Sequence, residues 1–139
     1  MKIIRNAHSG APAQLRTETF TGLVYADPVL AGEEGVAVNS VFFAPGARTY
    51  WHSHESGQFL YVVSGSGLIR AETSPGRVIR AGDVVWVPPG ERHWHGGGPM
   101  TMLLHVAVSL GKTTWLQEVT EAEYGQEAAR RQAVPEALE

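Results

Sequence analysis

Short apolar segments, each ended by a turn sequence, constrain the fold of this chain more than any other feature. Segments rich in Val, Ile, Thr and aromatic residues recur between about 36 and 110, and they end at glycine- or proline-containing turns such as Pro45-Gly46 and Ser64-Gly65-Ser66-Gly67. β-branched and aromatic residues favour strands, and closely spaced turns favour antiparallel pairing of neighbours. The pattern predicts an all-β sandwich or barrel.

The segments on either side of this region are different. A length of 139 residues fits one domain. Residues 1–35 are irregular, with one expected strand over Phe20 to Tyr25 and a turn at Asp27-Pro28. We expect them to form an N-terminal arm that packs on the barrel, at 36–110, or on a second subunit.

The residues after the barrel, 111–139, contain the signature of a helix. Thr120 and Glu123 have the spacing of a capping box, and Val119 and Tyr124 stand where a hydrophobic staple would be. The following residues are rich in good helix formers. The sequence predicts a C-terminal helix over about 121–133.

Composition excludes several classes of function. A net charge of −3 without any basic block gives no support to a nucleic-acid partner. The chain has no cysteine, which excludes disulfides and Cys-based metal sites. No apolar run has the length that crosses a bilayer, and the first residues lack the apolar core of a signal peptide. We therefore expect a cytoplasmic protein with no membrane partner.

Four of the six histidines form two close pairs, His52/His54 and His93/His95. Residues two apart on a strand point to the same face, so each pair can project together. Imidazoles from two strands that meet on one face suit a transition metal. A His-x-His pair alone is more often a pair of surface or hydrogen-bonded residues than a pair of metal ligands. The surrounding sequence decides between these interpretations.

Those surroundings are two spaced motifs. The residues that define them are Gly46, His52, His54, Gln58 and Gly65, followed by Gly82, Pro88, Gly90 and His93. Both motifs resemble the signatures of the cupin superfamily. The resemblance implies a single-domain double-stranded β-helix, or jelly-roll barrel, that forms a homodimer. It also implies one divalent metal ion per chain, held by His52, His54, Gln58 and His93.

Gln58 departs from the family pattern, in which most metal-binding members have Glu. An amide oxygen is a neutral ligand, so the full charge of a divalent ion would stay uncompensated. Such an ion should favour an anionic ligand or a developing oxyanion. The alternative interpretation of Gln58 is a decayed metal site.

A narrower resemblance covers residues from about Asn39 to Tyr124. It is to small bacterial cupins of the carboxymuconolactone-decarboxylase-associated type, which include manganese-dependent hydroxynitrile lyases. It implies manganese, with iron, nickel or zinc as alternatives, and a further histidine at His105. It also implies a substrate pocket lined by Asn39, Val41 and Ser109. In those lyases small apolar residues and a Gln tend to serve at the pocket positions, so Asn39 and Ser109 alter the pocket's shape and polarity.

His105 is a candidate catalytic residue on independent grounds. If the last long strand alternates, His105 shares one face with Leu103, Ala107 and Ser109, where a polar group needs a partner. It would then be a general acid or base near the metal, or a core histidine held by a hydrogen bond. His95 is the second candidate for proton transfer, or a residue beside the ligands or in solvent.

Three functions remain open at this stage. The first is an enzyme that uses a Lewis-acid metal on a small oxygenated organic substrate, of lyase, decarboxylase or isomerase type, with cyanohydrin cleavage as one case. The second is an Fe(II) dioxygenase. The third is a cupin that binds a small ligand without turnover.

Overall fold

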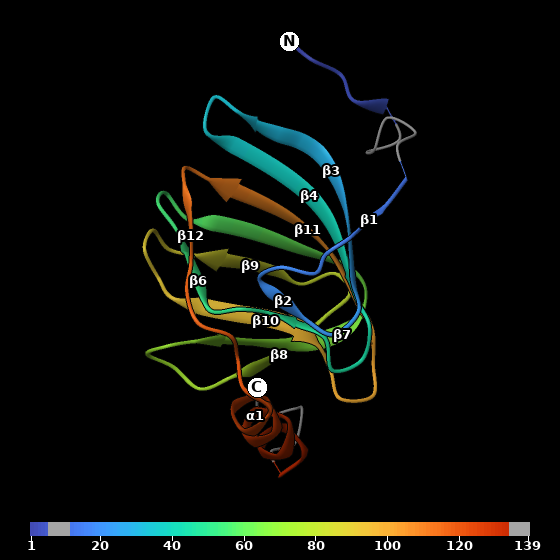
Figure 1. The fold of residues 1–139 in the computed structure, drawn as a ribbon, viewed down its shortest axis with the longest axis vertical. Helices are drawn as coiled ribbons and strands as arrows, with labels where there is room; N and C mark the ends of the chain where they lie inside the picture. Colours follow the sequence, from blue (N-terminus) through green and yellow to red (C-terminus); the bar gives the residue numbers. More distant parts are fainter. Residues whose placement is uncertain (6–11, 134–139) are drawn as a thin grey trace.

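The protein is a curled antiparallel sheet with one helix at its C-terminal end (Figure 1). The computed structural model describes residues 1–5 and 12–133. The elements are β1 (Gln14–Leu15), β2 (Phe20–Thr21), β3 (Val24–Glu33), β4 (Val36–Phe43), β5 (Arg48–Thr49), β6 (His52–His54), β7 (Gln58–Ala71), β8 (Arg77–Arg80), β9 (Val84–Val87), β10 (His93–Gly97), β11 (Leu103–Leu110), β12 (Thr113–Trp115) and α1 (Glu121–Ala133). The predicted all-β barrel with a C-terminal helix is confirmed.

The long strand β7 joins the two halves of the barrel. Its first part, from Gln58, pairs with β11 and β9, and its second part, up to Ala71, pairs with β10 and β8. β11 continues through β4 to β3, whereas β10 continues to β5 and β6. Because one strand belongs to both halves, the sheet curls and its inner face encloses a space.

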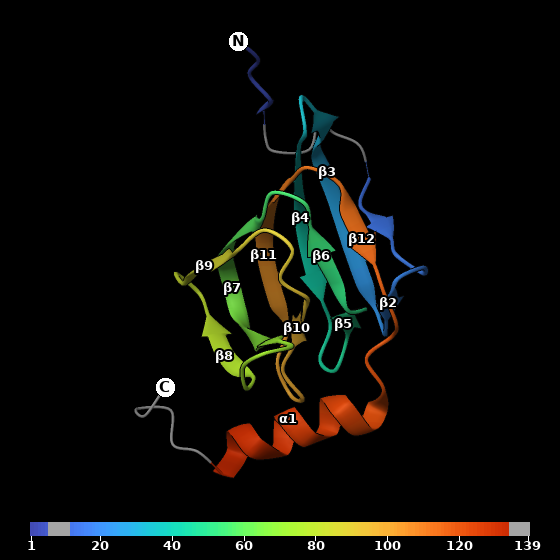
Figure 2. The ribbon, with the colours of Figure 1, turned by 90° about the vertical axis from the view of Figure 1, so that its left-hand side faces the viewer.

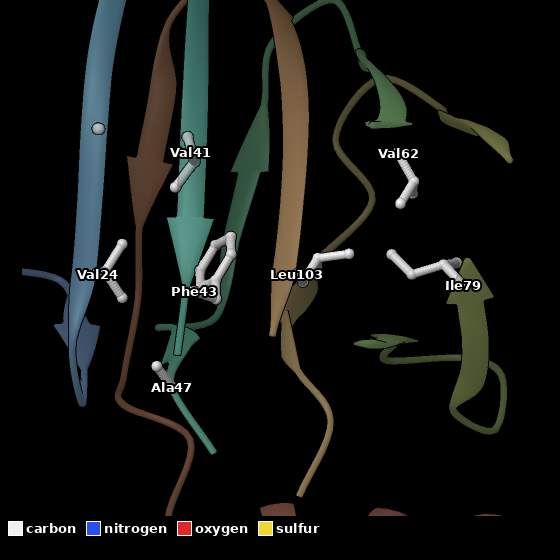
Figure 3. Close-up of a cluster of buried hydrophobic side chains, with 8 residues drawn as sticks. Val24, Val41, Phe43, Ala47, Val62, Ile79 and Leu103 are labelled. Carbon is white, nitrogen blue, oxygen red and sulfur yellow. The ribbon is translucent and has the colours of Figure 1, made fainter. Parts of the chain in front are cut away.

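The inner face is apolar toward one end. A buried cluster that includes Val24, Phe43, Val62, Ile79 and Leu103 fills that end (Figure 3). Along β11 the buried positions alternate, as predicted, and run from Leu103 in this cluster through His105 to Ser109. The same face therefore changes from hydrocarbon to polar groups as it leaves the core.

The helix α1 lies across one end of the barrel (Figure 2). Its capping box is formed, because Glu123 N–H donates to Thr120 Oγ1 and Thr120 N–H donates to Glu123 Oε1, both at 3.1 Å. Tyr124 packs with Trp51 and Trp94 in a second apolar cluster. Trp51 thus faces the helix, so the next residue, His52, faces the inside of the barrel.

The N-terminal region differs from the prediction. The expected strand over Phe20 to Tyr25 is interrupted at residues 22–23, between β2 and the start of β3 at Val24. The predicted turn at Asp27-Pro28 is wrong, since β3 runs through both residues and pairs with β4. A register shift between Pro28 and Leu30 accommodates the proline. β1 pairs with β3 only at Tyr25 and Ala26. Pro28 therefore has no partner in β1, and its lack of an N–H breaks no hydrogen bond to that strand. Residues 24–33 are therefore part of the sheet.

No helix among the described residues is long and apolar enough to cross a membrane.

Candidate metal centre

Three histidines converge inside the barrel from two paired strands. His52 and His54 come from β6 and His93 from β10, and His93 lies directly opposite His52 in the antiparallel ladder. The three side chains are each at most 3% exposed. Ring centroids lie 4.2 Å apart for His52 and His93, 5.0 Å for His52 and His54, and 5.5 Å for His54 and His93.

The Nδ1 atom of each of these three rings has a hydrogen-bond partner. His52 Nδ1 hydrogen-bonds to the carbonyl oxygen of Tyr50 at 2.8 Å, and His93 Nδ1 to that of Glu91 at 2.9 Å. A carbonyl only accepts, so both Nδ1 atoms carry the proton and both Nε2 atoms have a free lone pair. His54 Nδ1 lies 3.0 Å from the hydroxyl of Thr113, and its buried Nε2 has no hydrogen-bond partner. This arrangement is typical of metal-ligating histidines.

Gln58 is the fourth predicted metal ligand, and its amide oxygen lies beside His93. Its Nε2 donates to Ser109 Oγ at 3.0 Å, which turns its Oε1 toward His93 Nε2, also at 3.0 Å. Two lone pairs then face each other, which is unfavourable unless a cation lies between them. Ligands about 2.1 Å from one ion and at right angles lie about 3.0 Å apart. The residues present therefore fit a divalent metal ion.

A second set of three histidines shares two of these residues. Ligand nitrogens of His52, His93 and His95 lie within 4.8 Å of one another. The Nδ1 atom of His95 is hydrogen-bonded to His105 Nε2 at 3.0 Å, whereas that of His54 is hydrogen-bonded to the Thr113 hydroxyl. The set of His52, His93 and His95 is the histidine group whose ligand atoms the structure brings together among the described residues, and His54 is not in it. The ring centroid of His54 lies 5.0 Å from that of His52 and 5.5 Å from that of His93.

His95 and His105 form a buried pair beside the convergence. Neither ring is more than 3% exposed, and Phe43 packs edge-on against both. His95 Nε2 and His105 Nδ1 have no hydrogen-bond partner among the described residues. The pair shares one hydrogen bond and keeps a free nitrogen at each end, so it can hold a proton at either end.

Burial keeps all five histidines neutral near pH 7. It lowers the pKa of His54, His93 and His105 to about 4. The pKa values of His52 and His95 also lie well below the ordinary value, because burial and neighbouring histidines both disfavour the charged form. Neutral imidazoles are the form that binds metals and accepts protons.

We expect these low pKa values to make the metal-free protein sensitive to acid. Below about pH 6.5 the unfolded chain binds protons at the histidines while the folded chain does not, so the free energy of unfolding falls as pH falls toward 4. The loss is up to about 3 kcal/mol for each histidine whose pKa drops to about 4. Denaturant unfolding between pH 7 and 5, where carboxylates contribute little, measures it. A stability that stays constant over this range would contradict neutral burial.

A cavity of about 230 Å³ adjoins the histidines. The three positions expected to line a substrate pocket, Asn39, Val41 and Ser109, all lie in its wall. Residues of the N-terminal region and of β12 that the sequence did not indicate also line the cavity: Arg16, Thr19, Phe20, Thr113 and Trp115. No local pattern marks them, because they reach the cavity only through the pairing of β2 with β5 and of β12 with β6.

Comparison with known proteins agrees with this architecture. The family described as "Cupin domain" matches residues 39–106. An (R)-mandelonitrile lyase from Granulicella tundricola is 41% identical over 127 residues, which cover 87% of this chain and 97% of the relative. A cupin-like protein from Thermotoga maritima has 36% identity and a TM-score of 0.78, covering 91% of this chain and 97% of its own. A polyketide cyclase from Streptomyces resistomycificus has 18% identity and a TM-score of 0.68, covering 99% and 97%, and it supports the fold alone.

Proposed function

This chain belongs to the cupin superfamily, and we propose that it is a divalent-metal-dependent lyase acting on a small oxygenated organic molecule. The observation that supports the proposal is a group of buried, neutral histidines beside a cavity, in which ligand nitrogens of His52, His93 and His95 lie within 4.8 Å of one another. The relative named (R)-mandelonitrile lyase supports the reaction class, in which a bond to an oxygen-bearing carbon breaks.

We assign the metal to His52, His54, His93 and Gln58 rather than to the set that contains His95. The Nδ1 atoms of the three assigned histidines are tied to backbone carbonyls or a hydroxyl, which leaves Nε2 for the ion. We propose one ion per chain, with manganese favoured by the resemblance to manganese-dependent cupin lyases and with iron, nickel or zinc as alternatives. When bound, the ion supplies Lewis-acid stabilisation of negative charge on a substrate oxygen.

The chain's own groups would manage the proton and the substrate. The His95–His105 pair would take the proton of a substrate hydroxyl at one of its free nitrogens, and return it to the leaving group. Val41, Phe20 and Trp115 would exclude water from the cavity. Because the cavity is smaller than the roughly 300–1,000 Å³ of typical ligand pockets, the substrate must be small.

A first assay is turnover of (R)-mandelonitrile by the manganese-loaded protein, followed as release of benzaldehyde, beside a panel of small hydroxy and oxo acids. The proposal requires turnover of at least one compound that stops when the metal is removed. Oxygen uptake with iron alone would favour the dioxygenase instead. Binding of compounds without turnover of any would favour a non-catalytic cupin.

We also propose that the protein is a homodimer that pairs through the outer face of β7 and β9. Phe59, Tyr61 and Val63 on β7 and Val84 and Trp86 on β9 are between 37% and 56% exposed. Phe59 lies opposite Trp86, and Tyr61 opposite Val84, so the apolar side chains form one patch. Contiguous exposed apolar patches typically mark interfaces between proteins.

The dimer proposal predicts that Trp86→Glu yields a monomer. A charge at the centre of a buried interface is unpaired and costly, so association should weaken by more than about 100-fold. Sedimentation velocity measures the change, and Met100→Glu, on an 85% exposed residue outside the patch, is the matched control. A wild-type protein that sediments as a monomer at all concentrations would refute the proposal.

A further inference from the structure

The cavity beside the histidines contains one cationic side chain that the proposed reaction does not use. Arg16 lies between β1 and β2 and reaches the wall of the cavity that also contains His52 and Gln58. Its backbone N–H donates to the carbonyl oxygen of Val24 at 2.9 Å, which fixes this segment against β3. This main-chain contact places Arg16 at the cavity.

Nothing in the described part of the protein neutralises Arg16. Its Nε is buried and has no hydrogen-bond partner among those residues. No ion pair or aromatic contact joins Arg16 to another residue within 1–5 and 12–133, whereas the buried Arg48 has both, with Glu121 and Tyr124. The described residues that line the cavity include no Asp or Glu. A buried N–H without a partner costs free energy, so a ligand that accepts from it gains affinity.

We propose that the substrate carries a carboxylate, which Arg16 binds, in addition to the oxygen at the metal. The inference rests on the proposed function. Arg presents several N–H donors in a planar fork that fits a carboxylate in two contacts. The neutral ligand set of the proposed centre and the absence of acidic residues in the cavity wall both favour an anion. Arg16 would then select acids over neutral analogues such as nitriles.

The test compares mandelate with mandelamide, which replaces the carboxylate by a neutral amide of the same shape. Binding to the manganese-loaded protein is measured by calorimetry. We expect mandelate to bind at least about tenfold more tightly than mandelamide. Arg16→Gln should reduce mandelate affinity by about 10- to 100-fold and leave mandelamide affinity unchanged. Arg16→Lys should give an intermediate value.

Two controls separate this inference from its premise. Arg92→Gln removes the same charge from a side chain that is 59% exposed and outside the cavity, and it should leave both affinities unchanged. Titration of each variant with manganese alone reports the metal site. Unchanged mandelate affinity in Arg16→Gln, with metal binding and turnover intact, would overturn the inference alone. An Arg16-dependent preference in a protein that binds no metal would support the anion site and refute the proposed function.

Discussion

Replacing His54 with alanine is expected to remove the metal from the protein and to abolish turnover. His54 is buried, its Nδ1 is held by Thr113, and its Nε2 has no hydrogen-bond partner. Loss of residues that only support metal ligands already costs 10- to 100-fold in metal affinity, so loss of a ligand should cost more than about 100-fold. Metal content after dialysis, measured by mass spectrometry, checks this.

His95→Ala is the matched control, because His95 belongs to the alternative set of three histidines. We expect His95→Ala to retain one ion per chain and to lose turnover. The opposite pattern, in which His54→Ala keeps the metal and His95→Ala loses it, would move the ion to His52, His93 and His95. Thermal unfolding of both metal-free variants verifies that each is folded.

The second large effect concerns proton transfer. We expect His105→Gln to lower turnover by about 10²- to 10⁴-fold while metal content stays at the wild-type level. In the wild-type protein His105 Nε2 is hydrogen-bonded to His95 Nδ1. A glutamine at position 105 keeps a polar group beside His95, but its amide cannot take up a proton. The turnover number measured with saturating substrate isolates this step from binding.

The companion variant is His105→Phe, which removes the hydrogen bond as well. If His105 only orients His95, His105→Gln should retain most of the activity and His105→Phe should lose it. That result would contradict a role in proton transfer and support a structural one. Equal, large losses in both variants would agree with proton transfer.

The sequence was sufficient where strand periodicity and motif spacing determine the geometry. His52 and His54 share a face because they are two apart on a strand, and β11 alternates from Leu103 to Ser109. Trp51 precedes His52 on the chain, so it points to the opposite side and packs with Tyr124 of the helix. In each case the inward or outward direction follows from position along one strand.

It was insufficient where contacts depend on pairing between distant segments. Arg16 lines the cavity because the pairing of β2 with β5 brings the segment before β2 to this site. The sequence around Arg16 contains no motif that predicts this position. Pro28 has the local signature of a turn, but β3 absorbs it with a register shift. The contact between His95 and His105 joins β10 to β11, which are not paired with each other.

The most direct measurement of the central claim is an anomalous-scattering map from crystals of the manganese-loaded protein. The account predicts a single peak per chain, within bonding distance of Nε2 of His52, His54 and His93 and of Oε1 of Gln58. A peak that contacts His95 in place of His54, or no peak at the histidines under saturating manganese, would contradict it.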